Sequence, residues 1–395
     1  MKKKYISVLI QTNSLAFKYG GGSTGLVSIC NAFARNKSIK TTLLSFENEL
    51  SQKDIKILNK QLEEIKNIYL REFKLRIPTL SSFLKLLKEI SRNDLIYIHS
   101  MSSVFSIITF LFSKIFCKKT IFRFHGSLMK VYTKKFSLIK HFFTFIQLCL
   151  YKSADMFILS SEIEFNELKE YDFLNLLDKN KIRIIYESVE KNFQIKKKIK
   201  EFNLRNIDFL YVGRINKEKG IFEFLDFLNK SLENNDFEIK KSLKVIIAGP
   251  LDICFEKLFE KQITELQKRK NIEIKFKGFI SNKERNELYN DSKFFLYPTY
   301  GDCFGLSVVE ALYYGCKVIS TKNLGIYKSL LDLDLIYIYQ REYKKDKKLI
   351  NQIFSEKISN NIPKLEEKLN IYFGFDAYTE NYQHIINSFF DAKNN

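Results

Sequence analysis

The sequence predicts an α/β protein made of two doubly wound domains, each built on a parallel β-sheet. Short apolar runs alternate with longer segments of helical periodicity from one end of the chain to the other. The short runs are apolar throughout, which is typical of parallel strands covered by helices on both faces. A length of 395 residues is too great for one ordinary domain and suggests two.

The expected strands form one group in each half of the chain. In the first half they are 5–10, 41–46, 95–100, 120–125, 156–161 and 182–186; in the second, 209–213, 244–249, 272–278, 294–298 and 317–321. Helical segments separate them. One example is 220–232, where Phe222, Leu225, Leu228 and Leu232 recur at helical spacing.

Four segments follow from this pattern. We expect a first domain over 1–189 and a second over 207–370. Residues 190–206 are lysine-rich and lack strong periodicity, so we expect a linker there. Residues 371–395 predict a final amphipathic helix that packs back toward the first domain.

The formal net charge is +20, which is compatible with nucleic acid, an anionic membrane face or anionic small substrates as partners. Lysine bias alone is an equally weighted explanation, and no nucleic-acid-binding motif is present. Six cysteines without metal spacing predict free thiols in the cytoplasm. The first apolar run is about five residues, too short for a signal peptide, so we expect no export.

Two apolar stretches, 104–112 and 136–151, are too short to span a bilayer. The second has Lys134, Lys135 and Lys140 beside its aromatic residues, a composition compatible with lying on an anionic membrane. A buried helix of the first domain is the alternative, with at least equal weight.

In open α/β sheets ligands bind beyond the carboxyl ends of the strands, so the segments after strands are the places to search. After the first strand, Gly21, Gly22 and Ser23 belong to a glycine cluster that opens a helix. Glycines allow backbone amides to approach a phosphate, and the helix N-terminus adds a partial positive charge. A simple tight turn is about equally compatible with this pattern.

The segment "GRINKEKG" places Arg214, Lys217 and Lys219 between Gly213 and Gly220, which opens a helix. Cations at a helix N-terminus oppose the helix dipole unless an anion joins them. An arginine fork and a lysine point charge suit a diphosphate. A solvated basic turn is the alternative interpretation.

His125 ends an apolar strand and precedes a glycine, so its imidazole could point into a ligand crevice, although a structural histidine is equally compatible. In "YGDCFGLSVVEALYYG", Asp302 precedes a helix and Glu310 lies inside it. We expect both carboxylates to face the crevice and accept hydrogen bonds from sugar hydroxyls. The backbone amides of Phe304, Gly305 and Leu306 are expected to be exposed between them.

Four motifs in order resemble glycosyltransferase family 4, the retaining group 1 transferases with the GT-B fold. They are "GGGS", "FHGS", "GRINKEKG" and "DCFGLSVVEALYYGCKV", and together they cover nearly the full chain. The resemblance implies two Rossmann-like domains facing a central cleft, and a nucleotide-diphosphate sugar held mainly by the second.

Roles for individual residues follow from the same resemblance. Arg214 and Lys219 would bind the diphosphate, Glu310 the ribose, and Asp302 the donor sugar, which His125 would also contact. The remaining residues implied in donor binding are Gly21, Gly22, Ser23, Gly213, Gly278, Phe279, Ile280, Cys303, Phe304, Gly305 and Leu306.

The implied reaction transfers a hexose or N-acetylhexosamine, with retention, to a saccharide or lipid-linked saccharide acceptor. No metal or other cofactor is expected, because Lys219 would take the role that a metal ion has in other transferases. The pathway implied is bacterial capsule, lipopolysaccharide or other surface polysaccharide synthesis. The expected location is the cytoplasm, with peripheral contact at the inner membrane.

The sequence departs from the family pattern at several positions. Asp302 replaces the usual Glu, Cys303 a common Gly, and Lys317 the usual Pro. Glu187 and Ser188 stand where a Pro-Asn-Gly turn is frequent. None of these changes removes a diphosphate ligand, so we interpret them as altered specificity.

Several alternatives stay open. One is an epimerase or inverting transferase on the same scaffold, which the pair of acids disfavours. A metal-dependent transferase could use Asp332 and Asp334, but their context is apolar. A catalytically weak sugar-nucleotide-binding protein would bind donor without turnover, and a nucleic-acid binder would lose affinity steeply with salt.

Overall fold

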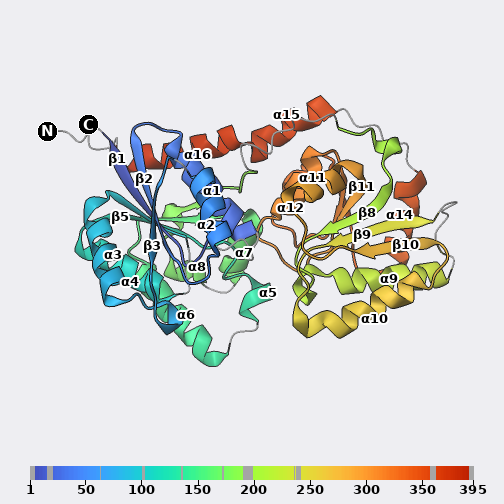
Figure 1. The fold of residues 1–395 in the computed structure, drawn as a ribbon, viewed down its shortest axis with the longest axis horizontal. Helices are drawn as coiled ribbons and strands as arrows, with labels where there is room; N and C mark the ends of the chain where they lie inside the picture. The colour runs from blue at the N-terminus through green and yellow to red at the C-terminus, as the bar shows by residue number, and fades with distance from the viewer. Residues whose placement is uncertain are drawn as a thin grey trace. The chain divides into compact units, whose positions relative to one another are not determined.

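The computed structural model describes residues 5–15, 21–62, 64–99, 103–134, 137–170, 173–189, 199–234, 236, 242–355 and 362–390. The chain divides into two compact units. The first comprises Met1–Asn192 and Asn370–Asn395, and the second comprises Phe193–Leu369 (Figure 1). Most of the predicted linker, 190–198, lies outside the described residues.

The first unit contains a seven-stranded parallel sheet in the order β3-β2-β1-β4-β5-β6-β7. Its strands are β1 (Ile6–Gln11), β2 (Ile39–Phe46), β3 (Lys66–Leu70), β4 (Leu95–Ile98), β5 (Lys119–Arg123), β6 (Met156–Leu159) and β7 (Ile182–Ile184). Its helices are α1 (Gly21–Ala34), α2 (Gln52–Gln61), α3 (Leu80–Arg92), α4 (Val104–Ile115), α5 (Lys130–Thr133), α6 (Leu138–Tyr151), α7 (Glu162–Glu170), α8 (Phe173–Leu176) and α16 (Phe375–Phe390).

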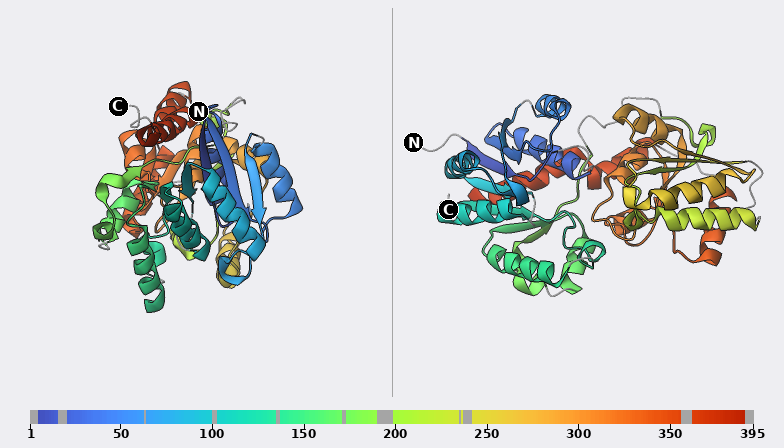
Figure 2. Two further views of the ribbon diagram at one scale, coloured as in Figure 1. Left: turned by 90° about the vertical axis from the view of Figure 1, so that its left-hand side faces the viewer. Right: turned by 60° about the horizontal axis from the view of Figure 1, so that its bottom comes forward.

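Both faces of this sheet are covered by helices and buried. Successive residues of a strand point to opposite faces, so each strand contributes to the core on either side. Val8 and Ile10 of β1 belong to a core shared with α1 and α16, whereas Leu9 belongs to a second core on the other face. The rings of Phe33 in α1 and Tyr382 in α16 meet edge to face at 5.2 Å. Figure 2 shows helices on both sides of the sheet. The last helix of the chain is therefore part of the first unit's core.

The second unit contains a six-stranded parallel sheet in the order β10-β9-β8-β11-β12-β13. Its strands are β8 (Ile207–Val212), β9 (Leu243–Ala248), β10 (Ile272–Phe276), β11 (Ser292–Tyr297), β12 (Lys317–Ser320) and β13 (Ile336–Ile338). Its helices are α9 (Ile221–Glu233), α10 (Glu256–Gln267), α11 (Asn282–Asp291), α12 (Leu306–Tyr313), α13 (Tyr327–Asp332) and α14 (Tyr343–Ser355). α15 (Ile362–Phe373) contains the division between the units.

The predicted doubly wound α/β fold is confirmed in both units. Two strands, β3 and β13, were not predicted. Both lie at a sheet edge and are only partly buried. β3 begins with polar residues and offers no long apolar run, whereas β13 lies in an apolar run, 335–339, that the strand predictions did not include. Among the described helices, none combines the length and apolar character needed to cross a membrane.

Candidate functional site

The loops after β8 and β11 lie against each other because these two strands are neighbours in the sheet. The Tyr300 amide donates to the Glu218 carbonyl at 2.8 Å. Gly220 has φ +67°, and a Cβ there would lie 1.9 Å from the Pro298 carbonyl oxygen, so only glycine allows this approach. The predicted basic loop and the predicted acidic segment thus meet at one sheet edge.

Lys219, Asp302 and Tyr297 form a closed triangle of polar contacts at this edge. The Lys219 ammonium is ion-paired with Asp302 and donates to the Tyr297 hydroxyl at 2.9 Å. The Tyr297 hydroxyl donates to Oδ2 of Asp302 at 2.5 Å. Only 10% of the Lys219 side chain and 14% of the Asp302 side chain are exposed. The residues that the sequence assigned to diphosphate and to sugar are therefore direct partners.

The electrostatics of the triangle are set by burial and by charge. Burial alone would raise the pKa of the Asp302 carboxyl, but the Lys219 ammonium, together with the hydrogen bonds from Tyr297 and the Phe304 amide, holds the pKa below its usual value. Burial and the Asp302 charge raise the pKa of Tyr297, so its hydroxyl keeps its proton. The Asn216 side chain accepts from the Lys219 amide at 3.2 Å and fixes the loop that carries the ammonium.

Arg214 differs from Lys219 in its surroundings, since its side chain is exposed. Its carbonyl accepts from the Tyr211 hydroxyl at 2.6 Å, which orients the loop. Gly213 packs so closely on the next strand end that a Cβ at Gly249 would lie 2.0 Å from the Gly213 carbonyl oxygen. The Arg214 guanidinium is therefore open to solvent, whereas the Lys219 ammonium is held by Asp302 and Tyr297.

The segment 278–280 follows β10 at the same edge of the sheet. Gly278 has φ +62° and accepts at its carbonyl from the Gly249 amide at 2.7 Å. Phe279 is 75% exposed and Ile280 is half-buried. An exposed ring at the carboxyl edge of the sheet could stack on a planar ligand group.

The start of α12 differs from the prediction in one respect. The Phe304 amide donates to Oδ1 of Asp302 at 3.1 Å, and the Phe304 ring is buried, so this amide is not exposed as expected. The short loop folds back on its own carboxylate. Gly305 has φ +91° and is buried, while Cys303 and Leu306 are half-buried.

Glu310 is buried against α11. Its Oε1 lies 3.2 Å from Nη2 of Arg285, and its Oε2 accepts from the Tyr289 hydroxyl at 3.0 Å. Arg285 and Tyr289 are four residues apart and so share one face of the helix. Asp302 and Glu310 therefore have different sets of protein partners.

A second polar cluster lies at the carboxyl edge of the first unit's sheet. His125 follows β5 with φ +48°, and its Nε2 lies 3.0 Å from Nδ1 of His99, which follows β4. Nδ1 of His125 lies 3.1 Å from Oε1 of Glu187. The same carboxylate oxygen accepts from the fully buried Arg123 guanidinium at 2.6 Å.

The protonation states in this cluster follow from its charges. Burial alone would raise the pKa of Glu187, but Arg123 and then His125 lower it to about 2. Burial lowers the pKa of His125, although Glu187 opposes this. A carboxylate only accepts, so Nδ1 of neutral His125 carries its hydrogen. Nε2 of His125 then accepts, and Nδ1 of His99 donates to it.

The predicted glycine cluster begins helix α1 beside this group. Gly21, Gly22 and Ser23 form the first turn of α1; the preceding residues 16–20 lie outside the described part of the chain. Two residues further along α1, a Cβ on Gly25 would lie 2.9 Å from Oε2 of Glu187. The start of α1 and Glu187 are therefore in contact.

Sequence reasoning missed several residues of these clusters. His99 ends its apolar strand just as His125 does, and that shared position was an available signal. Glu187 was noted only as a departure from a family pattern. Arg123, Arg285, Tyr289 and Tyr297 carried no local signal, because each was compatible with a strand or helix pattern.

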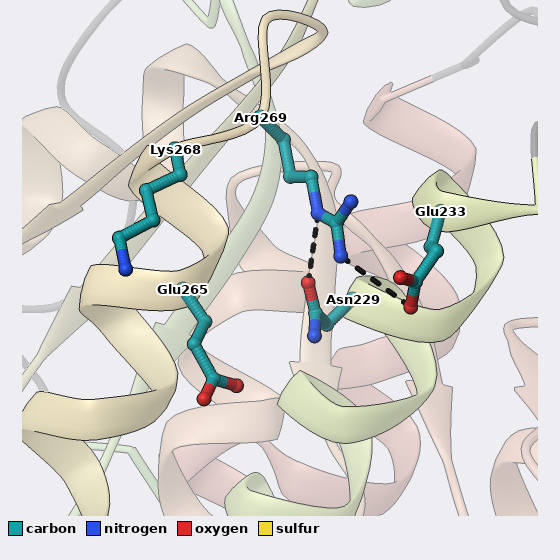
Figure 3. Close-up of a pocket in the computed structure, with 5 residues that line it drawn as sticks. All are labelled: Asn229, Glu233, Glu265, Lys268 and Arg269. Carbon is teal, nitrogen blue, oxygen red and sulfur yellow. Dashed lines mark hydrogen bonds and ion pairs between the residues drawn. The ribbon is translucent and has the colours of Figure 1, made fainter.

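Two other features lie away from these clusters. A surface pocket of about 420 Å³ lies between the C-terminal ends of α9 and α10, where Arg269 bonds Asn229 at 3.1 Å and Glu233 at 3.4 Å (Figure 3). The C-termini of these helices lie at the edge of the sheet where the strands begin. The site lies at the other edge, beyond the carboxyl ends of the strands, so this pocket is not part of it. Asp334 precedes β13, also at the edge where the strands begin. Within the described ranges, no cluster of three or more His, Cys, Asp or Glu residues could hold a metal.

Residues 192–370 match the family model described as glycosyl transferases group 1. The chain is 27% identical over 268 residues to an uncharacterized 41.2 kDa protein in the cps region of Klebsiella pneumoniae, covering 65% of this chain and 68% of that protein. It is 24% identical over 262 residues to the O-antigen chain mannosyltransferase RfbU of Salmonella typhimurium, covering 66% of this chain and 61% of that protein.

Among solved structures, Alr3699/HepE of Anabaena in complex with UDP-glucose superimposes with a TM-score of 0.73 at 15% identity. The match covers 97% of this chain and 100% of the Anabaena chain. With its two parallel-sheet units, the chain has the GT-B fold. Its second unit lies within the residues that match the group 1 glycosyl transferase model.

Proposed function

We propose that this protein is a retaining, metal-independent glycosyltransferase of family 4. Its donor would be a hexose or N-acetylhexosamine carried on a nucleotide diphosphate. Its acceptor would be a lipid-linked glycan at the cytoplasmic face of the inner membrane. The product would serve a bacterial capsule, lipopolysaccharide or other surface polysaccharide. The names of the relatives, an O-antigen chain mannosyltransferase and a protein of a cps region, support this pathway.

The observation that carries the proposal is the Lys219–Asp302–Tyr297 triangle beside the exposed Arg214, in the unit that matches group 1 glycosyl transferases. A diphosphate placed there would meet a lysine point charge and an arginine fork. Asp302 would lie within one hydrogen bond of the same ammonium, next to the sugar carried by that diphosphate. The site thus offers cations for the leaving group and an acceptor for a sugar hydroxyl.

The reaction requires little covalent participation by the protein. The bond between the sugar C1 and the diphosphate oxygen breaks, and the acceptor hydroxyl oxygen bonds to C1 from the same side. The hydroxyl proton passes to the departing diphosphate, so charge and atoms balance. Lys219 and Arg214 would stabilise the charge that develops on the leaving group, an electrostatic contribution made by preorganised cations.

The residues of the first unit would act on the sugar and the acceptor. His125 would contact the sugar through its imidazole, held by Glu187 and His99. In the second unit, Glu310 would accept from the ribose hydroxyls, and Phe279 and Ile280 would lie near the base. Glu310 is already bonded to Arg285 and Tyr289, so a ribose would share its carboxylate with them.

The test is a mass-spectrometric scan of UDP-, GDP-, ADP- and dTDP-sugars for slow donor hydrolysis, with EDTA present. Wild type is compared with Lys219→Ala and Glu310→Ala. Lys217→Ala is the matched control, since Lys217 lies on the same loop but is exposed. We expect one nucleotide diphosphate to be released by wild type and by the control, and not by the two test variants.

Other outcomes distinguish the alternatives. A donor that binds without release, even when lipid acceptors are added, would favour a catalytically weak sugar-nucleotide-binding protein. Release that occurs only when EDTA is omitted would contradict metal independence. If no donor bound at all, the assignment of the second unit's site would be wrong.

A further inference from the structure

Helix α6 (Leu138–Tyr151) exposes an unusual amount of apolar surface. Seven of its large apolar side chains are exposed: Leu138, Ile139, Phe142, Phe143, Phe145, Ile146 and Leu150. We call this set the α6 apolar face. Phe142 and Phe143 are 62% and 59% exposed. A contiguous exposed apolar surface of this kind marks a site of interaction with another molecule.

The helix is anchored on its other side by a narrow stripe. Thr144, Leu148 and Tyr151 are its buried residues, and the Tyr151 ring contacts Phe122 at 4.1 Å and Phe110 at 5.2 Å. At about 100° per residue, this stripe and the α6 apolar face lie on nearly opposite sides of the helix. The alternative of a buried helix over 136–151 is therefore wrong. Figure 1 shows α6 on the outside of its unit.

The segment of the chain that carries α6 has charged residues of one sign only. Residues 95–154 contain no Asp or Glu, while they contain nine Lys and Arg residues. Lys134, Lys140 and Lys152 are exposed at the ends and flank of the helix; Lys135 lies outside the described residues. A partner for this surface must therefore combine an apolar layer with negative charge.

A second copy of the chain fits this requirement poorly. Two α6 helices placed face to face would bring lysines of both copies together without an acid on either helix to pair with them. An anionic bilayer supplies both parts: headgroups that attract lysines and an acyl region that accepts the apolar side chains. A helix of 14 residues is about 21 Å long, shorter than the ~30 Å hydrocarbon core, so it can lie on a bilayer but not span it.

We propose that α6 is a membrane-docking helix, which lies in the surface of an anionic bilayer with its apolar face inserted and its lysines against the headgroups. The inference goes beyond the transfer reaction, because it rests on α6 alone and uses no residue of either polar cluster. It adds the surface by which a lipid-linked acceptor and the first unit would meet.

The absence of tryptophan from the sequence allows a direct test. Phe143→Trp introduces a sole tryptophan on the α6 apolar face, and Leu84→Trp introduces one on α3 at nearly equal exposure, 58% against 59%. We expect the emission of the α6 reporter to shift to the blue with phosphatidylcholine–phosphatidylglycerol vesicles, and to be quenched by lipids brominated in the acyl chain. The α3 reporter should respond to neither.

A second measurement tests whether membrane binding requires the α6 apolar face. In vesicle sedimentation, Leu138→Ser with Phe142→Ser should weaken binding at least about tenfold, because two apolar side chains no longer enter the bilayer. Leu80→Ser on α3, 74% exposed in the wild type, is the matched control and should bind like wild type. Raising salt, or omitting phosphatidylglycerol, should also weaken wild-type binding.

Donor hydrolysis without vesicles should be equal in all these variants. If hydrolysis fails in wild type while vesicle binding holds, the proposed function is wrong and the docking helix stands. If vesicles shifted the emission of the α6 reporter no more than that of the α3 reporter, the docking proposal would be overturned. A dimer in sedimentation equilibrium that Leu138→Ser with Phe142→Ser abolishes would also overturn it, since a second copy would then cover the α6 apolar face.

Discussion

The Lys219 ammonium donates a hydrogen bond to the Tyr297 hydroxyl at 2.9 Å, and that hydroxyl donates a hydrogen bond to Asp302 at 2.5 Å. Tyr297 ends the strand before the acidic segment, whereas Lys219 ends the basic loop. The tyrosine therefore couples the two motifs through a group that belongs to neither. Because its pKa is raised above its ordinary value of 10, the Tyr297 hydroxyl keeps its proton at neutral pH and acts as a donor to Asp302.

Tyr297→Phe removes this coupling while keeping the ring. Asp302 would lose one of its donors, and Lys219 one of its acceptors. We expect kcat/KM for donor hydrolysis to fall about tenfold, with a loss of about 1 kcal/mol in the free energy of unfolding. Steady-state kinetics and urea denaturation measure both.

Tyr211→Phe is the control for Tyr297→Phe. The two rings stack at 6.5 Å, but the Tyr211 hydroxyl donates to the Arg214 carbonyl and not to a charged group. A smaller kinetic loss is expected for the control. Equal losses in the two variants would show that the coupling to Asp302 has no special part in hydrolysis.

The buried pair of Lys219 and Asp302 makes a prediction about stability. Lys219→Met or Asp302→Asn leaves one charge without its partner in a site from which water is largely excluded. Each single change should lower the free energy of unfolding by about 3 kcal/mol. The double variant should lose less than the sum, because no uncompensated charge remains.

Chemical denaturation of the four proteins in this cycle measures the coupling. Lys293 and Asp208 offer a comparison in the same unit, since their pair is more exposed, at 27% and 14% of the side chains, and contacts at 2.7 Å. A coupling energy near zero would show that Lys219 and Asp302 do not form a tight buried pair.

Topology made part of this site predictable from sequence. The loops after β8 and β11 could be singled out because apolar runs locate the strands, and ligands bind beyond the carboxyl ends of parallel strands. The triangle itself was not predicted. Whether Lys219 points to a ligand or to Asp302 depends on a contact between residues 83 positions apart, which local patterns do not encode.

Glu310 and Glu187 show the same limit in different ways. The position of Glu310 on α12 followed from helical spacing, but its burial against Arg285 depends on how α11 packs on α12. Glu187 stood out as an unusual residue in a turn. Its role beside His125 appeared only when β5 and the segment after β7 were placed at one sheet edge. Sequence patterns locate the elements, whereas partners between elements require the packed fold.

The depressed pKa of Glu187 predicts a pH dependence of stability. The pKa is about 2 in the folded protein against an ordinary value of 4.5, so the folded state binds fewer protons between these values. This contribution is fully present above pH 4.5 and is lost as the pH falls toward 2. Its size is about 3 kcal/mol, from 1.36 kcal/mol per pKa unit.

Glu187→Gln should therefore lower the free energy of unfolding at pH 7 by about this amount, with the difference from wild type shrinking toward pH 2. Denaturant titrations across the acid range measure it. Glu47→Gln is a control, because Glu47 pairs with Arg71 on the surface and should change stability by under 1 kcal/mol. A constant difference at all pH values would mean that Glu187 contributes by packing and not by charge.

Gly25→Ala tests whether the start of α1 positions the Glu187 carboxylate. The new Cβ would lie 2.9 Å from Oε2 of Glu187, so the carboxylate must shift by a few tenths of an ångström. Alanine favours the helix by about 1 kcal/mol over glycine, which offsets the strain, so we expect stability within about 1 kcal/mol of wild type. The displaced carboxylate should disturb the hydrogen bond to Nδ1 of His125. An NMR titration of the His125 imidazole should then show a changed pKa.

Adding Glu187→Asp, which is one methylene shorter and withdraws from the new methyl group, should relieve the clash. If the His125 titration is unchanged by Gly25→Ala alone, the carboxylate is held by Arg123 firmly enough that α1 has no part in positioning it.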